Sequence, residues 1–225
     1  MCNATGLDFV RRNLNSRDIT GKDVIEVGSC NVNGSPRELI VSLNPKSYLG
    51  VDISQGPGVD EICDISDLVS RYGLNSFDLV ICCEVFEHIR DWRSALTNLK
   101  GILKEDGVLL LTTRSIGFPY HGYPDDFWRF EQTDIAKIFS DLVVEANEID
   151  EESPGVFVKG IKKHDFQELD LSDYALFSII SNRRTKAVSE FDYIKVRLVE
   201  SLKSLARKIL PRKFIQNLKN AFGRA

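Results

Sequence analysis

Long hydrophobic runs are missing from the sequence. No stretch of its 225 residues approaches the roughly 18 consecutive apolar residues that a membrane-spanning helix requires. The first residues also lack the basic segment and apolar run of a secretory signal. We therefore expect a cytoplasmic protein, which could still attach peripherally to a membrane. The length suits one well-buried domain with a modest appendage.

Paired cysteines are missing as well. The five cysteines are odd in number and include no C-x-x-C pair, so a disulfide framework or a zinc knuckle is a poor fit. We expect reduced thiols that pack as small apolar side chains. The five are Cys2, Cys30, Cys63, Cys82 and Cys83.

Positive charge is scarce in the body of the chain and concentrated in its tail. Residues 183–225 hold twelve Lys or Arg against three acids, whereas residues 1–182 hold 17 basic and 30 acidic residues. The acidic body makes nucleic acid an unlikely partner. The basic tail is a candidate contact for anionic lipid, RNA or an acidic partner, and we expect a membrane-surface or acidic-partner contact through residues 196–225.

Short aliphatic runs alternate with stretches of helical periodicity through most of the chain. Apolar residues recur at helical spacing over residues 37–43, 65–72 and 92–103. Alternating strands and helices predict βαβ units and a mainly parallel sheet that helices cover on both faces. The predicted strands are residues 24–27, 48–52, 60–63, 77–82 and 107–112.

The later segments predict the end of the sheet and an appendage. A helix over residues 132–140 precedes two strands, 142–149 and 155–161, whose short connection indicates an antiparallel hairpin. We place a domain boundary between residues 1–162 and an extension, 163–225. The extension contains an amphipathic basic helix that either packs on the domain or docks on a membrane or partner. Its apolar stripe is Leu198, Leu202, Leu205 and Ile209, it ends at Pro211, and a second helix is predicted over 214–222.

Glycines are missing from the loop that follows the first strand. The segment "DVIEVGSCNVNGS", residues 23–35, begins like a nucleotide-binding strand, but Cys30 stands where a G-x-G-x-x-G loop has its second glycine. Gly28 allows a sharp turn, and Asp52 follows it by 24 residues, a spacing that suits hydrogen bonds to ribose hydroxyls. These features alone fit either a domain that binds NAD or a domain that binds another nucleoside cofactor.

Three further segments narrow the choice. "EICDIS" ends the third predicted strand, "FDLVICCEVFEH" covers the fourth, and "LKEDGVLLLTT" contains the fifth. With these segments, residues 7–162 resemble the class I methyltransferases that use S-adenosyl-L-methionine, and the methyltransferase type 11 group in particular. The resemblance implies a doubly wound α/β fold, with a seven-stranded, mainly parallel sheet ending in an antiparallel hairpin, and S-adenosyl-L-methionine as cofactor.

The resemblance also implies the cofactor contacts. Glu26 and Gly28 would frame the methionine moiety, and Asp52 would bind the ribose. Asp64 would bind the adenine, and Glu84 would lie next to the transferred methyl. The whole implied set is Glu26, Gly28, Ser29, Cys30, Asp52, Ile53, Asp64, Ile65, Cys83 and Glu84.

The loop, with Cys30 in place of the second glycine, suits this cofactor. S-adenosyl-L-methionine has no phosphate, so the close backbone approach that a dinucleotide demands is not needed and Cys30 can be accommodated. Asn31 and Asn33 can form left-handed or self-hydrogen-bonded turns in place of glycine, and Gly34 restores one permissive position. The loop therefore argues against NAD.

A cluster of acids and a histidine follows the fourth strand. Glu84, Glu87 and His88 would share one face if their segment is helical. Two methyltransferase groups with similar E-x-x-E-H segments, the small-RNA 2'-O-methyltransferases and the quinone-pathway O-methyltransferases, hold a divalent cation there. Many relatives show none, and His88 can equally pack or cap a loop. We therefore assign no metal and keep these three residues as candidate ligands.

A second source of catalytic groups is the loop "TTRSIGFPYHGYPDDFWRFEQTD", residues 112–134. Its prolines, glycines and aromatic residues suggest a shaped loop over the active site. His121 is our first choice for a general base, with Glu84 and His88 as the other catalytic candidates. Arg114 and Arg129 are expected to pair with one of the two neighbouring aspartates, Asp125 and Asp126, or to meet an anionic substrate.

The predicted activity is methyl transfer to a small-molecule, glycan or lipid-linked acceptor, with oxygen as the methylated atom. The cofactor supplies the electrophile, so the enzyme mainly aligns the reactants and excludes water. Two alternatives stay open: an RNA 2'-O-methyltransferase with a divalent metal, and a non-catalytic methyltransferase-like binding scaffold.

Overall fold

The fold is taken from a computed structural model, which describes residues 3–122 and 124–209. The chain divides into two compact units, residues 1–187 and residues 188–225. The first contains a large sheet with its flanking helices, and the second contains one long helix.

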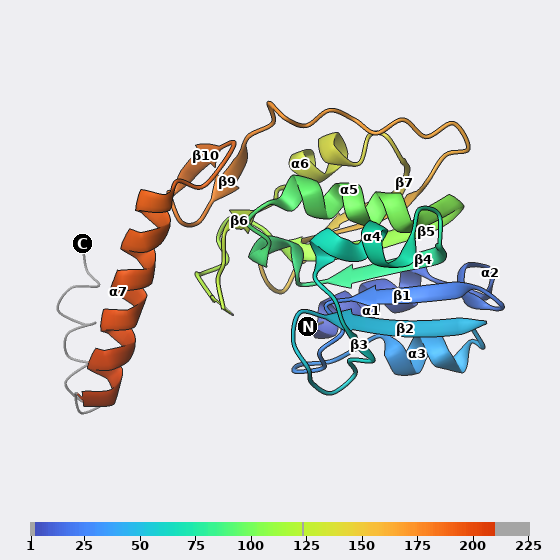
Figure 1. Cartoon of the computed structure of the whole chain (residues 1–225), viewed down its shortest axis with the longest axis horizontal. Coiled ribbons are helices and arrows are strands. Elements are labelled where there is room, and N and C mark those ends of the chain that lie inside the picture. The colour runs from blue at the N-terminus through green and yellow to red at the C-terminus, as the bar shows by residue number, and fades with distance from the viewer. Residues whose placement is uncertain (1–2, 123, 210–225) are drawn as a thin grey trace. The chain divides into compact units, whose positions relative to one another are not determined.

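A seven-stranded sheet with the order β3-β2-β1-β4-β5-β8-β7 forms the centre of the first unit (Figure 1). Its first five strands in that order run parallel, whereas β8 pairs antiparallel with both β5 and β7. The predicted doubly wound sheet with a terminal hairpin is therefore confirmed. The strands are β1 (Asp23–Val27), β2 (Ser47–Asp52), β3 (Glu61–Ile62), β4 (Phe77–Cys83), β5 (Leu103–Arg114), β7 (Val143–Ile149) and β8 (Gly155–Ile161).

Helices cover both faces of this sheet. On one face, Phe9 and Ile40 pack in a common cluster with Leu79 and Ile81 of β4. On the other face lie α4 and α5, as Figure 1 shows. The helices are α1 (Ala4–Asn13), α2 (Ser16–Ile19), α3 (Arg37–Ser42), α4 (Leu68–Tyr72), α5 (Trp92–Ile102) and α6 (Gln132–Ile138), with the single 3-10 turns η1 (Ile65–Asp67) and η2 (Phe86–His88).

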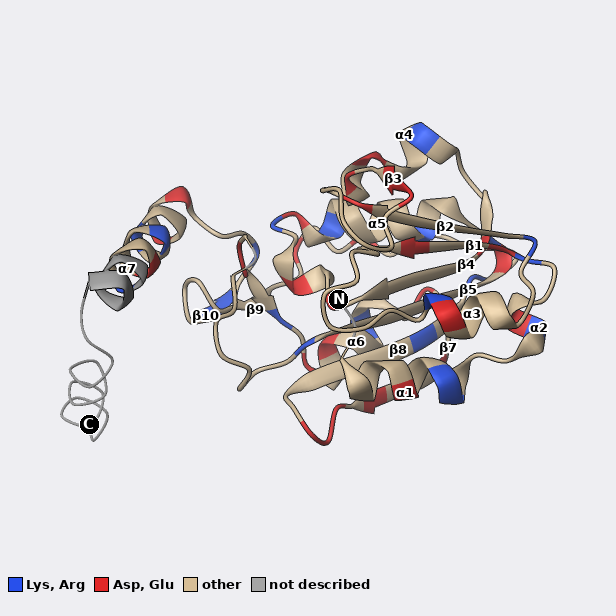
Figure 2. Cartoon of the chain, turned by 90° about the horizontal axis from the view of Figure 1, so that it is seen from below, with Lys and Arg blue, Asp and Glu red and all other residues tan. Residues whose placement is uncertain are grey.

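The strands at the centre of the sheet carry few charges. β4 is buried along almost its whole length, and in Figure 2 the charged residues lie mainly on helices and loops. Burial on both faces explains the apolar runs within β4 and β5, residues 79–83 and 108–111. This composition made the strands predictable from the sequence.

A small second sheet, β10-β9-β6, continues the first unit beyond the predicted boundary at residue 162. It consists of β6 (Trp128–Arg129), β9 (Leu176–Ser178) and β10 (Arg183–Thr185). Arg93 of α5 holds the same segment, because its guanidinium donates to the carbonyl oxygens of Leu171 at 2.7 Å and Lys186 at 2.9 Å, and to that of Tyr174. These contacts explain why the compact unit runs to Ala187.

The second unit contains α7 (Glu190–Ile209), which includes the predicted amphipathic helix and begins earlier in the chain. Pro211 and the second helix expected over residues 214–222 lie outside the described residues. Within the described residues, no helix combines the length and apolar character needed to cross a membrane.

Candidate active site

The candidate site begins at the turn after β1. Gly28 has a φ of +81°, and a Cβ atom placed there would lie 2.0 Å from Cγ2 of Val85. Only glycine fits this position without strain or displacement. Because Val85 follows β4, the same contact brings the β1 loop against the E-x-x-E-H segment. Two parts of the site that are distant in sequence therefore meet at the carboxyl ends of neighbouring strands.

Backbone hydrogen bonds shape the β1 loop. The N–H groups of Gly28 and Ser29 both donate to the carbonyl oxygen of Val51, at 2.8 and 3.0 Å. The N–H of Gly34 donates to Oδ1 of Asn31 at 3.1 Å, which confirms the predicted self-hydrogen-bonded turn at Asn31. Asn33, the second residue expected in such a turn, is not among the positive-φ residues.

Glu26 holds the β1 loop in place through hydrogen bonds from two side chains. Its carboxylate is 3 % exposed and accepts hydrogen bonds from Tyr48 Oη and from Ser35 Oγ, the latter at 3.2 Å. Burial raises the pKa of Glu26 in spite of these two hydrogen bonds, which oppose the shift. The residue expected to frame the methionine moiety thus also ties the loop to β2.

Asp52 and Ile53 lie at the end of β2, where a ribose and an adenine could be bound. Oδ2 of Asp52 accepts a hydrogen bond from the N–H of Cys30 at 3.2 Å, and the carboxylate is half-buried. Ile53 is 57 % exposed and offers an apolar surface beside it. A carboxylate that is partly open and already oriented suits hydrogen bonds to two ribose hydroxyls.

Asp64 and Ile65 follow β3. Oδ1 of Asp64 accepts from the N–H of Ser66 at 2.8 Å and so caps η1. The Asp64 side chain is exposed, whereas Ile65 is only 3 % exposed. Because the side chain of Ile65 is buried, Ile65 can contact an adenine only through its backbone groups.

Cys83 and Glu84 were expected beside the transferred methyl group, and their side chains are engaged elsewhere. Cys83 packs in the hydrophobic cluster with α1. Glu84 accepts a hydrogen bond from Thr112 Oγ1 at 3.0 Å and contacts the guanidinium of Arg114. Burial, reinforced by the charge of Glu87, raises the pKa of Glu84 to about 8. Only the backbone of these residues can still line the cofactor.

Glu84 is also separated from the two residues that share its motif. Its φ of +54° lies in the left-handed region, and the following turn η2 starts only at Phe86. Glu84 therefore does not share a helical face with Glu87 and His88, which corrects the predicted arrangement. A non-glycine residue held in this region is strained, and such strain often occurs at functional sites.

His121 takes the place that Glu84 was expected to fill. Oε1 of Glu87 lies 3.8 Å from Nε2 of His88 and 3.6 Å from Nε2 of His121, and the two imidazole rings are 4.7 Å apart. Glu87 is completely buried, and its Oε2 accepts from Thr113 Oγ1 at 2.9 Å. Two predicted catalytic residues, His88 and His121, are thus neighbours.

The remaining nitrogen of each ring is bonded on the side away from Glu87. Nδ1 of His88 lies 2.5 Å from the carbonyl oxygen of Asp125, which can only accept a hydrogen bond, so Nδ1 carries the hydrogen. Nδ1 of His121 lies 2.9 Å from Oδ2 of Asp126. These partners direct Nε2 of both rings toward the Glu87 carboxylate. His88 therefore also caps the loop.

Asp126 is a buried carboxylate held by two cations. Arg129 donates to both of its oxygens, at 2.6 and 2.7 Å, which confirms one of the predicted pairings, whereas Arg114 pairs with Glu84 instead. Burial would raise the pKa of Asp126, but hydrogen bonds from Arg129 and His121 hold it well below its usual range. Burial would likewise lower the pKa of His121, but Asp126 and Glu87 outweigh it and raise that pKa to about 9.

The cluster of Glu87, His88 and His121 also fits a divalent cation. The three ligand atoms lie within 4.8 Å of one another. Among the described residues, Oε1 of Glu87 and Nε2 of His88 are buried and have no hydrogen-bond partner. Two imidazoles and a carboxylate suit Zn²⁺ or another first-row transition metal, which would polarise a coordinated hydroxyl group. The structure thus replaces Glu84 by His121 in the candidate ligand set.

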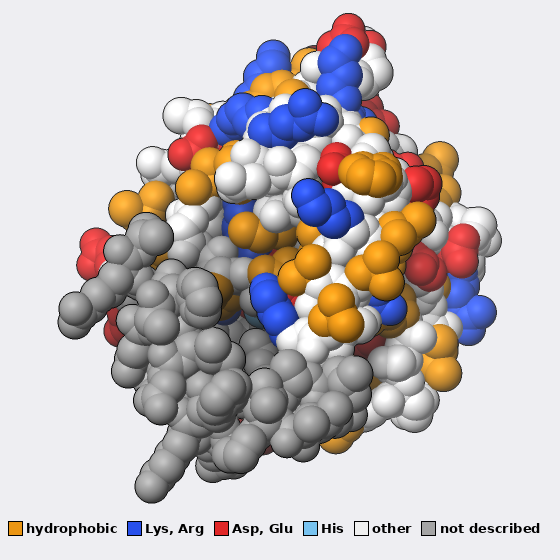
Figure 3. Space-filling model, turned by 90° about the vertical axis from the view of Figure 1, so that its left-hand side faces the viewer, with side chains coloured by type: hydrophobic (Ala, Val, Ile, Leu, Met, Phe, Trp, Pro, Cys, Tyr) orange, Lys and Arg blue, Asp and Glu red, His pale blue; other side chains and the backbone are white. Residues whose placement is uncertain are grey.

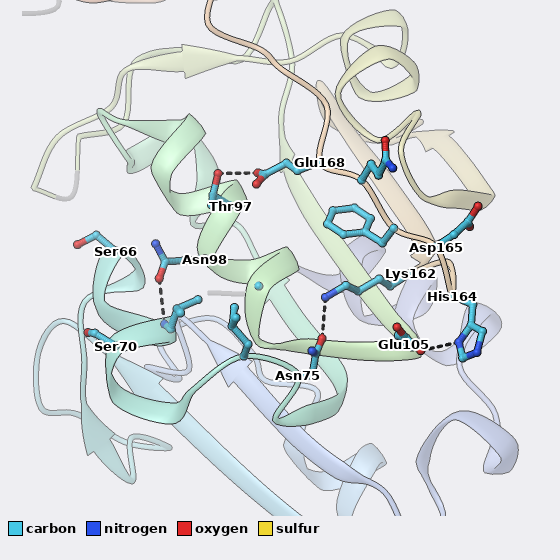
Figure 4. A pocket seen from close by; sticks show the side chains of 15 residues that line it. Ser66, Ser70, Asn75, Thr97, Asn98, Glu105, Lys162, His164, Asp165 and Glu168 are labelled. Atoms are coloured by element: carbon cyan, nitrogen blue, oxygen red, sulfur yellow. Dashed lines mark hydrogen bonds and ion pairs between the residues drawn. The ribbon is translucent and has the colours of Figure 1, made fainter.

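A cavity of about 860 Å³ lies elsewhere, between α4, α5 and residues 162–168 (Figure 4). Asn75, just before β4, and Glu105, near the start of β5, are among its lining residues. Its polar side chains pair with one another, for example Lys162 with Asn75 at 2.9 Å. This cavity lies toward the amino ends of the strands, so it is separate from the site described above.

The fold and the site together define a nucleoside-cofactor enzyme of the doubly wound class with a modified glycine loop. Residues 5–141 match the family model described as a methyltransferase domain. The chain therefore belongs to this family of methyltransferases, and S-adenosyl-L-methionine is its cofactor. No curated protein matches the chain.

Solved structures show the same fold at low sequence identity. The 1,6-didemethyltoxoflavin-N1-methyltransferase of Burkholderia thailandensis, solved with its substrate and S-adenosylhomocysteine, is 12 % identical, with a TM-score of 0.59 over 72 % of this chain and 79 % of its own. S-adenosylmethionine-dependent methyltransferases from Mesorhizobium loti and Listeria monocytogenes are 16 % and 14 % identical, with TM-scores of 0.52 and 0.54. They cover 71 % and 72 % of this chain and 98 % and 99 % of their own. At such identities the likeness concerns the fold.

Proposed function

We propose that the chain transfers the methyl group of S-adenosyl-L-methionine to an oxygen atom of a small-molecule, glycan or lipid-linked acceptor. The observation that supports an oxygen acceptor is the pairing of Glu87, in the segment after β4, with His121, in the loop after β5. A hydroxyl group must lose its proton when it attacks a methyl group, and these two residues provide a proton-accepting pair. A neutral amine acceptor would not require such a pair before attack.

His121 is the residue that we propose to take the proton. Asp126 fixes Nδ1 by the 2.9 Å hydrogen bond, which leaves Nε2, 3.6 Å from Oε1 of Glu87, to take the proton. Because Asp126 and Glu87 raise the pKa of His121 to about 9, the protonated ring predominates at pH 7. The negative charge of the Glu87 carboxylate stabilises the imidazolium that forms when His121 takes the proton. The positive charge of a bound sulfonium would favour the unprotonated ring.

The acceptor is proposed to be small. The Burkholderia thailandensis neighbour acts on a small heterocycle, and its fold covers most of this chain. An RNA acceptor is disfavoured by the excess of 13 acids over basic residues in positions 1–182. A divalent cation held by Glu87, His88 and His121 would serve the same kind of acceptor, because it would lower the pKa of a hydroxyl group.

The experiment is methyl transfer from S-adenosyl-L-methionine with a tritiated methyl group. The acceptors are phenols and sugars. Each is tested in three matched forms: the free hydroxyl compound, its amino counterpart and its methyl ether, in which the hydroxyl group is blocked. We expect labelled methyl ethers from the free hydroxyl compounds only. Methylation of the amines instead would contradict an oxygen acceptor.

Calorimetry separates this proposal from a non-catalytic scaffold. Binding of S-adenosyl-L-methionine that is lost in Asp52→Ala supports the enzyme, because the half-buried carboxylate of Asp52 is the proposed ribose contact. A chain that does not bind the cofactor at all would be a scaffold. Asp64→Ala probes the adenine side of the same site.

A further inference from the structure

Within the second unit, no described residue covers an apolar stripe along α7. Phe191, Ile194, Leu198 and Leu202 follow one another at helical spacing and are 77 %, 55 %, 60 % and 65 % exposed. In α1, by contrast, the apolar residues Phe9 and Val10 are completely buried against the sheet. Scattered apolar residues on a surface need no explanation, but a continuous stripe along one helix indicates a binding partner.

Basic residues accompany this stripe. Lys195 and Lys203 are exposed on the same helix, and Lys195 lies one turn from both Phe191 and Leu198 on the apolar side. Figure 3 shows hydrophobic and basic side chains next to one another on the face that it displays. In the sequence, residues 190–225 contain nine Lys or Arg against three acids, Glu190, Asp192 and Glu200. The partner that fits this helix therefore has an apolar layer next to negatively charged groups.

We propose that residues 190–225 bind an anionic lipid surface, with α7 lying in the plane of the membrane and its apolar stripe inserted between headgroups and acyl chains. An amphipathic helix with a basic flank binds membranes in this way, by burial of its apolar face and by attraction to anionic lipids. Lys195 fits this position because its long stem can lie along the apolar layer while its ammonium group reaches the phosphates.

A second copy of the chain fits the same surface less well. Pairing two α7 helices along their stripes would bury Lys195 and would bring two strongly basic segments together. An anionic surface has the complementary charge. Membrane binding also agrees with the absence of a helix that could cross a bilayer from the described residues.

The test is flotation of the full chain with vesicles of phosphatidylcholine alone or of phosphatidylcholine mixed with phosphatidylglycerol. We expect binding to the mixed vesicles, weaker binding at high salt, and little binding to phosphatidylcholine alone. Leu198→Glu and Leu202→Glu should each weaken binding about tenfold or more, because a charge replaces a buried apolar side chain. Leu74→Glu is the matched control, since Leu74 is 66 % exposed but lies in the first unit.

Other outcomes would overturn the proposal. If light scattering shows that the free protein is a dimer and that Leu198→Glu converts it to a monomer, the apolar stripe binds a second copy of the chain. Binding that Leu198→Glu leaves intact, but that RNA or another soluble polyanion displaces, would assign the basic residues to such a polyanion. If the unaltered chain floats with neither kind of vesicle, the proposed membrane contact is wrong. Cofactor affinity, measured in parallel, reports on the catalytic domain alone.

Discussion

Asp126 contacts His121 twice, because both the backbone N–H and the ring nitrogen Nδ1 of His121 lie 2.9 Å from Oδ2 of Asp126. Arg129 holds the same carboxylate through two further hydrogen bonds and keeps it ionised. The ring is therefore oriented by a buried group that cannot move independently. This arrangement directs Nε2 of His121 toward Glu87 and makes the ring the centre of the proposed chemistry.

His121→Asn should lower the methyl-transfer rate by about 10²- to 10⁴-fold, because it removes the proposed base. The affinity for S-adenosyl-L-methionine and the melting temperature should change little, since the buried pair of Asp126 and Arg129 remains intact. Single-turnover rates and calorimetry measure these effects. His164→Asn is the control, because His164 is exposed and pairs only with Glu105 among the described residues. Equal rate losses in both variants would disprove the role of His121.

The rate of the metal-free enzyme should depend on pH through His121. The unprotonated ring is the active form, and its pKa is raised to about 9. The rate should therefore rise about tenfold per pH unit below pH 9 and level off above it. Rates measured in the presence of EDTA, over a pH range in which the fold is intact, test this prediction. A rate that falls as the pH rises toward 9 would require a protonated His121 instead.

Added Mn²⁺ or Zn²⁺ should bind to Glu87, His88 and His121 and shift the pH profile to lower pH. The shift follows because a cation at Nε2 of His121 occupies the proposed proton acceptor and would instead lower the pKa of a coordinated acceptor hydroxyl group. Equilibrium dialysis should show that His88→Ala and His121→Ala each weaken cation binding about tenfold or more. His164→Ala again serves as control. If EDTA changes neither activity nor its pH profile and dialysis shows no bound cation, the metal is dispensable.

The sheet could be predicted from the sequence because buried parallel strands have a distinctive composition. β4 and β8 begin and end within one residue of their predicted bounds. The strands β6, β9 and β10 were missed, since two or three residues are too few to show a period and these strands lie outside the alternation of strands and helices that placed the equally short β3. They form only through long-range partners such as Arg93, which no local pattern reveals.

The site could be predicted in position but not in side-chain detail. Gly28 and Asp52 lie at the strand ends where their spacing placed them. Cys83 and Glu84 are adjacent in sequence, yet one packs in the core and the other meets Arg114, because Glu84 adopts a positive φ that sequence alone does not disclose. His121 joins Glu87 only when the loop after β5 folds back over β4. The one available signal for Asp126 was its proximity in sequence to Arg129.

Arg93→Ala should lower the free energy of unfolding by about 2–4 kcal/mol, because three carbonyl oxygens lose a charged donor that also stacks on Trp92. Urea unfolding followed by fluorescence gives this value, and limited proteolysis should show earlier cleavage within residues 171–186. Arg71→Ala is the control, since Arg71 forms an exposed pair with Glu61 and should contribute at most about 1 kcal/mol. Similar losses in both variants would contradict the role of Arg93 in holding this segment.

Gly28→Ala should abolish cofactor binding, and Gly21→Ala should not. Both glycines have positive φ, +81° and +71°, so alanine introduces strain of about 1–2 kcal/mol at either position. At Gly21 a new Cβ meets no described atom within 4 Å, whereas at Gly28 it meets Cγ2 of Val85 at 2.0 Å. Calorimetry should show at least a hundredfold loss of S-adenosyl-L-methionine affinity in Gly28→Ala alone. Adding Val85→Ala removes the clashing atom and should restore part of the affinity; if it restores none, the contact between the β1 loop and the segment after β4 does not control the site.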